Sequence, residues 1–526
     1  LLFQWIETGK ISGLRIDHID GLYDPAGYLE GLRARTGEQY ICVEKILDLS
    51  EELPSRWPVQ GTTGYDFMNY VNGIFCRKNN EKAFNRLYTQ ITGLRTAYPD
   101  LTAEKKRLIM GKHMAGDVDN LAQFIKRISD RYRYGRDITL YGLKRALVEI
   151  MALFPVYRTY ADGRHYSTRD RSYIKKTIQG AARSNPGLQY ELNIIEQILL
   201  LEWNDALTEE ERSQWVHLVM RFQQFTGPLM AKGFEDTVLY TYNRLLSLNE
   251  VGGDPGTFGI PLPRFHAFLR ERSEQWPYSL NATSTHDTKR GEDVRARINV
   301  LSEIPAEWGG TVRQWSRMNR KKKRKLNKSP VPDRNDEYAL YQTLIGAFPF
   351  NEDDYPAFVE RIKEYIIKAI REAKVHTAWL KPDTAYEEAF VDFIESILQL
   401  SEGNPFLDAF LPFQQKTAFY GIFNSLSQIL IKVTAPGVAD FYQGTELWDL
   451  SLVDPDNRRP VDFDRRRAIL NDIKKGINKD IPALITQLWA TKENGGVKLF
   501  LIHRALAARR ERADIFHSGP YIPLAT

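Results

Sequence analysis

Gly13-Leu14-Arg15-Ile16-Asp17-His18 is the stretch of this chain that decides the fold. Its polar and apolar residues alternate, which is the period of a strand with an apolar back and a polar front. Asp17 then falls at the carboxyl end of the strand. An α/β barrel keeps its chemistry at such ends, because the strand fixes the side chain and the loop after it leaves room for substrate.

A helix and a second strand follow this stretch. Asp24-Pro25 is a helix start, with Asp as N-cap and Pro in the first turn, and Gly37 ends the helix. Tyr40 to Glu44 is typical of a strand with Glu44 at its end. A strand, helix and strand of this length form a right-handed parallel crossover, so we predict the α/β class, as a (β/α)8 TIM barrel or a doubly wound sheet.

Two later stretches resume the pattern. We expect a strand over Leu280 to Asp287 and another barrel strand with its exit loop over Ala435 to Gly444. Asp17, Glu44 and Asp287 thus put acids at three strand ends. Taken alone, each acid is more often a structural ion pair or a solvated residue, but three in one chain favour a sugar-cleaving site.

The sequence between these strands is predicted to be mostly helical. The periodicity predicts helices over 82–91, 119–132, 140–153, 172–182, 188–201, 209–225 and 235–248, a second helical stretch from 294 to about 400, and a helix over 497–512. The expected division is therefore barrel parts at 1–60, 276–295 and 401–480, helical insertions at 61–275 and 296–400, and a helix with the start of a β-domain at 481–526.

Composition narrows the function classes. A net charge of +5 over 526 residues is too mild to indicate nucleic acid or an anionic membrane surface as a partner. The basic run Arg320 to Lys325 is interpreted as a solvated helix face. Two cysteines, one of them Cys42 in an expected buried strand, and no apolar run of membrane-spanning length indicate a reduced, cytoplasmic protein. No metal ligand set stands out.

The acids differ in their surroundings, as retaining cleavage of a glycosidic bond requires. That reaction needs an ionised carboxylate and a protonated carboxyl group about 5 Å apart. Arg15, on the same strand face, favours the ionised form of Asp17, which makes Asp17 the nucleophile. Apolar neighbours should raise the pKa of Glu44 to that of a general acid and base. Asp287 would hold sugar hydroxyls, with His286 as its neutral hydrogen-bond partner.

Three segments carry a resemblance to a known family. Gly13 to Leu22, Val43 to Leu47 and Ser284 to Arg290 resemble the second, third and fourth signature regions of the α-amylase family of glycoside hydrolases, and most of all its trehalose-forming members. Supporting segments span most of the chain: 61–67, 154–160, 231–237, 332–338 and 442–450. The resemblance implies an eight-stranded barrel with strands 4 and 5 in 1–60, strand 7 in 276–295 and strand 8 in 401–480.

The resemblance also implies roles and a reaction. Asp17 would be the nucleophile, Glu44 the acid and base, and Asp287 the transition-state stabiliser. The α-1,4 bond at the reducing end of a maltooligosaccharide would be broken and the released glucose rejoined as an α,α-1,1 trehalose end, without a cofactor or metal. Water must be kept out, so we expect a wall around the sugar made of Lys232, Phe234, Lys289, Arg158 and Tyr65. Arg15, His18 and His286 are further residues that we expect to bind substrate. A trehalose-releasing hydrolase is the implied functional partner.

One departure of this sequence from the family pattern leaves alternative functions open. The family's first signature region has no counterpart after Leu1, so we expect a barrel that is incomplete at its N-terminus and a C-terminal β-domain that stops near Tyr521. The alternatives are an α-glucan hydrolase or transglycosidase of the same family, or a catalytically incomplete α-glucan-binding fragment.

Overall fold

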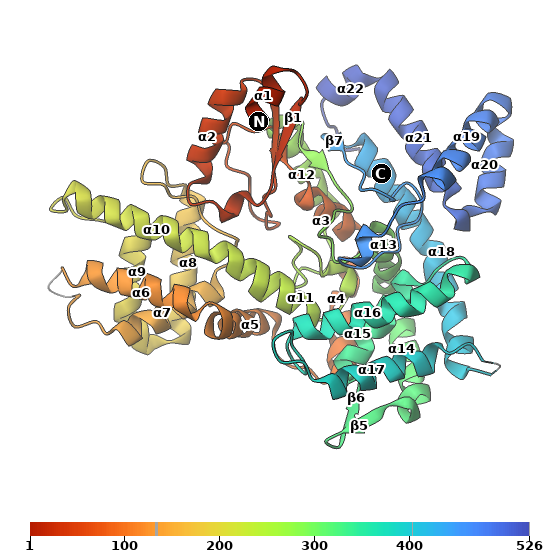
Figure 1. Cartoon of the computed structure of the whole chain (residues 1–526), viewed down its shortest axis with the longest axis horizontal. Coiled ribbons are helices and arrows are strands. Elements are labelled where there is room, and N and C mark those ends of the chain that lie inside the picture. Colours follow the sequence, from red (N-terminus) through yellow and green to blue (C-terminus); the bar gives the residue numbers. More distant parts are fainter. Residues whose placement is uncertain (132–134, 402, 525–526) are drawn as a thin grey trace. The chain divides into compact units, whose positions relative to one another are not determined.

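The computed structural model describes residues 1–131, 135–401 and 403–524 (Figure 1). The chain divides into two compact units, each built from two stretches of sequence. Unit 1 comprises Leu1–Val59 and Thr96–Val238, and unit 2 comprises Gln60–Arg95 and Leu239–Thr526. Asp17 and Glu44 therefore belong to unit 1, and Asp287 belongs to unit 2.

Unit 1 opens with the expected strand, helix and strand. β1 (Gly13–Ile16) and β2 (Tyr40–Val43) pair in parallel, with Ile16 opposite Val43. α2 (Pro25–Thr36) connects them; the side chain of Asp24 accepts the N–H of Gly27 at 2.9 Å at its start. The crossover prediction is confirmed, and the register sets the residues that follow the two strands at one edge.

The rest of unit 1 is helical. α7 packs against α5, α6, α8 and α9 around fully buried residues such as Leu143, Ile150 and Leu192. The elements are α1 (Leu2–Glu7), η1 (Ile19–Gly21), α5 (Tyr98–His113), α6 (Ala115–Ser129), α7 (Leu140–Leu153), α8 (Thr168–Ser184), η3 (Pro186–Leu188), α9 (Gln189–Leu199), α10 (Glu209–Leu229) and the π-helical η4 (Met230–Val238).

Unit 2 has short strands among many helices. β4 (Leu280–Asn281) pairs in parallel with β7 (Val438–Ala439), β5 (Arg324–Leu326) and β6 (Ser329–Val331) form a hairpin, and β3 covers Gly61–Thr62. The helices are α3 (Tyr65–Ile74), η2 (Lys78–Asn80), α4 (Glu81–Thr92), α11 (Leu239–Thr241), η5 (Leu246–Leu248), α12 (Leu262–Gln275), α13 (Glu292–Val300), η6 (Leu301–Glu303), α14 (Pro305–Asn319), η7 (Arg320–Lys322), α15 (Arg334–Ala347), η8 (Glu352–Asp354), α16 (Tyr355–Ala373), α17 (Thr384–Leu398), α18 (Pro405–Thr434), η9 (Asp456–Arg458), α19 (Phe463–Lys479), α20 (Ile481–Ala490), η10 (Lys492–Asn494), α21 (Gly496–Glu511) and α22 (Ala513–Ser518).

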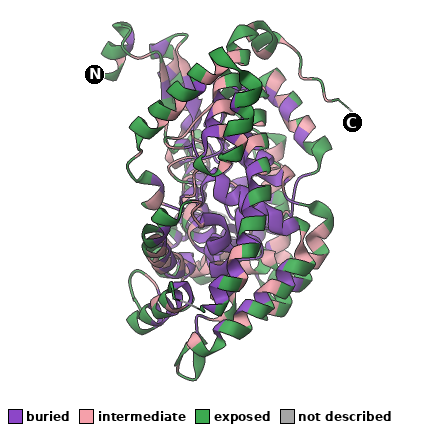
Figure 2. Ribbon diagram, turned by 90° about the vertical axis from the view of Figure 1, so that its right-hand side faces the viewer, coloured by how far each residue is buried: buried purple, intermediate pink, exposed green. Residues whose placement is uncertain are grey.

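Aromatic rings form much of the core of unit 2. Trp315 is fully buried and lies 5.3 Å from Tyr341 and 5.3 Å from Phe410, measured between ring centroids. Figure 2 shows buried residues on the inward faces of the helices and exposed residues on the outward faces. Many aromatic side chains of unit 2 are thus used in packing.

The helix predictions hold where the apolar period is regular. The helix over 140–153 is confirmed at both ends, and that over 209–225 continues to Leu229. The helix over 119–132 begins earlier and ends at Ser129, and Tyr132 lies outside the described residues. The helix over 235–248 is interrupted: residues 235–238 belong to η4 and Leu239–Thr241 form α11, and only the short η5 follows at Leu246–Leu248. The Asn249 amide donates to the carbonyls of Leu239 and Tyr242, at 2.8 and 2.7 Å, which gives partners to groups that a continuing helix would use.

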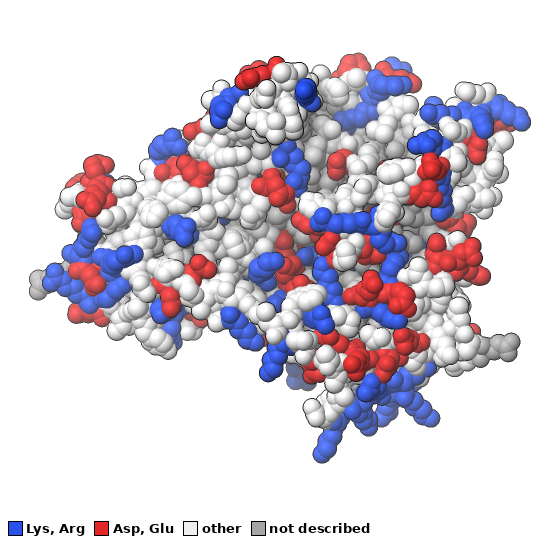
Figure 3. Space-filling view, in the orientation of Figure 1, with Lys and Arg blue, Asp and Glu red and all other residues white. Residues whose placement is uncertain are grey.

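Two further expectations need correction. The strand over 280–287 ends at Asn281, since the following residues form side-chain turns such as the bond from Thr288 Oγ1 to the Thr285 carbonyl. The basic run is not one helix face, because it passes from η7 into the β5–β6 hairpin, where Figure 3 shows Lys and Arg side chains gathered beside acidic ones. Lys323 and Arg324 pair with Glu337 and Asp392.

Both cysteines, Cys42 and Cys76, are buried and free. Among residues 1–131, 135–401 and 403–524, no helix has the length and apolarity that crossing a membrane requires.

Candidate active site

Two carboxyl groups meet at the carboxyl edge of β1 and β2. The register carries Asp17 and Glu44 just past the paired Ile16 and Val43. Arg15 joins them, because its guanidinium lies 2.6 Å from Asp17 Oδ1 and 3.1 Å from Glu44 Oε2. The Asp17 side chain is 68% exposed and that of Glu44 only 12% exposed. The two acids therefore share one cation but differ strongly in their access to water.

That difference separates their protonation. Burial raises the pKa of Glu44 to about 7, and a hydrogen bond to the Asp17 carboxyl adds to the increase, while the charge of Arg15 opposes it. The backbone N–H of His18 also donates to Glu44 Oε2, at 3.3 Å. His18 adopts a left-handed conformation at φ 45°, which turns the chain into η1. Glu44 is thus the carboxyl group that can hold a proton near neutral pH.

The Asp17→Asn substitution should lower the pKa of Glu44. In the parent protein the negative charge of Asp17 raises the pKa of Glu44. The neutral amide of asparagine removes that charge while Arg15 stays in place, so the pKa of Glu44 falls. Observation of the Glu44 carboxyl carbon by NMR across pH 4 to 9 measures the shift. An unchanged or higher pKa in the variant would show that the two carboxyl groups do not interact.

A buried charge network lies directly behind this pair. The Lys45 ammonium is fully buried, 3.2 Å from Asp20 and 2.9 Å from Glu51. Burial lowers the pKa of Lys45, but the charges of the two carboxylates outweigh it and hold that pKa above its ordinary range. Burial raises the pKa of Glu51 to about 7 in spite of Lys45. Tyr160 donates to Asp20, so the network ties η1 to the end of β2.

The Lys45→Met substitution should destabilise unit 1 by about 3–5 kcal/mol, because it removes the cation that pairs with the buried Asp20 and Glu51. Without that cation the pKa of Glu51, which burial already raises to about 7, rises further. The loss should therefore be larger at pH 8 than at pH 5, where Glu51 holds a proton. Urea unfolding at both pH values measures it. The exposed Lys112→Met is the control, and an equal change in the two variants would contradict the assignment.

Arg158 supports the same loop. It is 1% exposed, and its guanidinium donates to the carbonyls of Asp20 and Leu22 at 2.8 and 2.6 Å. Its contact with substrate stays a prediction; what the structure shows is an arginine that holds the segment after His18.

Asp287 lies in a loop of unit 2 held by its neighbours. Its N–H donates to Thr285 Oγ1 at 3.1 Å, and the Tyr65 hydroxyl lies 3.1 Å from the same oxygen. Asn457 donates to the carbonyl of His286 at 2.9 Å, and the His286 ring lies 3.4 Å from Asp287 Oδ2. The Asp287 side chain is 48% exposed, so its carboxyl group faces solvent on a fixed loop.

Glu250 fixes the continuation of this loop. Its carboxylate is 1% exposed and accepts the backbone N–H groups of Lys289 and Arg290, at 2.6 and 3.2 Å, and a bond from Arg295 at 3.2 Å. The Lys289 ammonium lies 5.6 Å from the Tyr240 ring centroid. Lys289 is thereby anchored at its backbone and packed along its side chain.

Lys232 and Phe234 belong to the π-helical η4 of unit 1. The Lys232 ammonium pairs with Asp236 at 2.7 Å and its side chain is 66% exposed, whereas Phe234 is 8% exposed. The structure therefore brings Arg15, Asp17, His18 and Glu44 together in unit 1, and Tyr65, His286, Asp287 and Lys289 into one region of unit 2. That all three acids surround one sugar stays a prediction.

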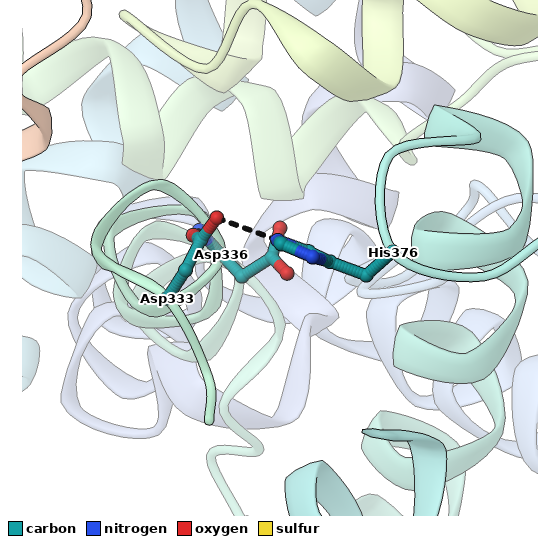
Figure 4. A group of neighbouring side chains, drawn as sticks. All are labelled: Asp333, Asp336 and His376. Carbon is teal, nitrogen blue, oxygen red and sulfur yellow. Dashed lines mark hydrogen bonds and ion pairs between the residues drawn. The ribbon is translucent and has the colours of Figure 1, made fainter. Parts of the chain in front are cut away.

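One group among the described residues has the donor set of a metal site. Ligand atoms of Asp333, Asp336 and His376 lie within 4.8 Å of one another (Figure 4). His376 Nε2 lies 2.8 Å from Asp333, Asp333 also caps α15, and the Tyr386 hydroxyl donates to Asp336 at 2.6 Å. Each member already has a hydrogen-bond partner, so the group is accounted for as a helix cap and ion pair.

Sequence reasoning missed the residues that position the acids. Lys45 stands directly after Glu44 and carries a signal, since a charge within an apolar stretch needs a partner. Its partners Asp20 and Glu51 and the more distant Tyr160 follow only from the fold. Glu250 carried no signal, because its function depends on backbone groups almost 40 positions away.

The comparisons with known proteins agree with one another. No protein-family model matches the chain. A curated relative from Mycobacterium tuberculosis, named a putative maltooligosyl trehalose synthase, is 31% identical over 522 residues, which is 99% of this chain and 60% of the relative. The solved maltooligosyltrehalose synthase of Arthrobacter ramosus is 32% identical, with a TM-score of 0.82, over 98% of this chain and 60% of that one. The solved structure of a hypothetical maltooligosyl trehalose synthase from Sulfolobus tokodaii is 35% identical, with a TM-score of 0.76, over 98% of this chain and 62% of that one.

These likenesses and the parallel crossover give the chain the α/β barrel fold, interrupted by helical insertions, of the solved proteins it resembles. In sequence and in fold the chain is similar to the maltooligosyltrehalose synthases. It spans about 60% of the length of the curated relatives it matches.

Proposed function

We propose that this chain carries the catalytic acids of an intramolecular transglucosylase. It would convert the reducing-end α-1,4-linked glucose of a maltooligosaccharide into an α,α-1,1-linked trehalose end. The observation that carries the proposal is the pair of Asp17 and Glu44 at one strand edge, with one carboxyl group exposed and the other holding a proton. The names of the relatives support the choice of reaction.

The first step breaks the α-1,4 bond. Asp17, which pairs with Arg15 at 2.6 Å, attacks the anomeric carbon as a carboxylate, while Glu44 donates its proton to the oxygen of the leaving glucose. The two carboxyl groups are hydrogen-bonded to one another, whereas a retaining site needs about 5 Å between them. We propose that the Asp17 side chain, which is the more exposed of the two, turns toward a sugar ring placed between them.

The second step forms the new bond. The released glucose turns and presents its own anomeric hydroxyl, Glu44 removes the proton from that hydroxyl, and the oxygen displaces Asp17 from the glycosyl carbon. Atoms balance, because the product is an isomer of the substrate. For Asp287 we propose stabilisation of the oxocarbenium-like transition state, on the strength of its signature segment. Lys232, Phe234, Lys289 and Tyr65 are proposed to exclude water.

Incubation with maltopentaose tests the reaction. Isomerisation should remove reducing ends without yielding shorter products, and the rate at low substrate should fall as the pH rises above about 7, since Glu44 must start protonated. Product analysis by chromatography together with a reducing-end assay follows both. A gain of reducing ends would contradict isomerisation and indicate hydrolysis.

Hydrolysis is the second candidate, for a specific reason. The Asp17 side chain is 68% exposed, so water can approach the carbon that Asp17 would hold. An α-glucan hydrolase or transglycosidase would use the same two carboxyl groups. We further propose a cytoplasmic protein that supplies its product to a trehalose-releasing hydrolase, as the resemblance implies.

A further inference from the structure

A cavity of about 590 Å³ opens along α18 in unit 2. It lies within the range of roughly 300–1,000 Å³ that is usual for ligand sites. Its walls come from the segment before α16, from one face of α18 and from η10. Phe348, Phe350 and Phe419 line it. None of these residues belongs to the carboxyl pair or to the Asp287 loop.

Gln414 is the feature of this cavity that needs explanation. It is 4% exposed and lines the cavity, and no described residue forms a hydrogen bond with its side-chain amide. Its amide atoms are not among the fully buried polar atoms that lack a partner, so the cavity gives them access to water. The native packing leaves this amide facing the cavity, so a ligand with hydroxyl groups could satisfy its oxygen and nitrogen together.

The charges of the cavity favour a neutral ligand. Lys492 and Glu493 are paired at 2.9 Å, and Glu352 is the remaining charged group of the lining. Among the described residues of the lining, no cation is left over to bind a phosphate or carboxylate. The side-chain amides of Asn351 and Gln415 add further polar groups at the wall.

Aromatic rings supply much of the apolar part of the cavity lining. Phe419 is 40% exposed, and Phe350 is partly exposed on the opposite segment. Rings with apolar faces beside side-chain amides match a sugar, which has C–H groups on its faces and hydroxyl groups at its edge. A lipid or an apolar helix would leave the Gln414 amide unsatisfied.

We propose that this cavity is a second, non-catalytic binding site for an α-1,4-linked glucose chain. Gln414 would bind hydroxyl groups and Phe419 would stack on a ring. The choice of an α-glucan rests on the proposed function, whereas the requirement for a neutral polyhydroxylated ligand does not. Such a site would hold a long glucan on unit 2 independently of turnover at the acids.

Binding of maltoheptaose to the chain tests the proposal. The measurement uses the Glu44→Gln variant, which prevents turnover, and calorimetry together with hydrogen exchange of the segments 348–355 and 407–422. Maltoheptaose should slow exchange in both segments. Gln414→Leu and, separately, Phe419→Ala should weaken the binding component assigned to these segments at least tenfold.

Phe463→Ala is the matched control, because Phe463 is 56% exposed on α19 and does not line the cavity. Phe419→Ala removes an exposed ring and should leave the circular dichroism of the fold unchanged. Equal affinity in all variants, or no protection of either segment, would overturn the proposal. Protection of both segments in the Glu44→Gln variant, together with no trehalose-end formation by the parent protein, would instead contradict only the proposed function.

Discussion

The Asp17→Asn substitution is expected to lower the rate of trehalose-end formation by several orders of magnitude, with folding nearly unchanged. Asparagine keeps the size of the side chain but cannot attack the anomeric carbon as an anion. Asp17 is 68% exposed, so its loss should hardly change the free energy of unfolding. Product formation from maltopentaose measures the first effect and urea unfolding the second.

The control for this variant is Asp24→Asn, a nearby acid that caps α2 and has no proposed chemical role. It should retain most of the activity. Near-normal turnover by Asp17→Asn would refute its role as the nucleophile. If both variants lost activity and stability together, Asp17 would be part of the fold rather than of the reaction.

Local sequence pattern was sufficient to predict the strand edge of unit 1 that carries Asp17 and Glu44. The alternation around Arg15, the Asp24-Pro25 helix start and the apolar run before Glu44 are short-range signals, and each is confirmed. The raised pKa of Glu44 also follows from its apolar neighbours. These features depend on residues that lie within a few positions of one another.

Other features depend on distant partners and could not be predicted. The helix expected over 235–248 breaks because Asn249 takes backbone carbonyls, and the strand expected over 280–287 ends where side-chain turns begin. Glu250 positions the Lys289 backbone from almost 40 residues away. Asn249 and Glu250 are buried polar groups that find their partners through the tertiary fold, which a helix or strand period does not encode, whereas the turn from Thr285 to Thr288 is local.

The Glu44→Gln substitution is expected to lower the rate by several orders of magnitude with natural maltooligosaccharides, because no proton reaches the leaving oxygen. A substrate whose leaving group needs no proton, such as α-maltosyl fluoride, should recover most of the rate of the first step. Release of fluoride measures this recovery. Equal loss on both substrates would show that Glu44 is not the acid.

The same variant should be more stable than the parent at alkaline pH. The pKa of Glu44 is raised to about 7 in the folded chain, so between its ordinary value near 4.3 and 7 the folded state binds more protons than the unfolded state, and stability falls as the pH rises. Glutamine removes this penalty, which reaches up to about 3 kcal/mol at pH 8 and vanishes at pH 4. Thermal unfolding at the two pH values measures it. A carboxyl group kept only for structure would give the opposite sign, because its removal would destabilise the chain at pH 8.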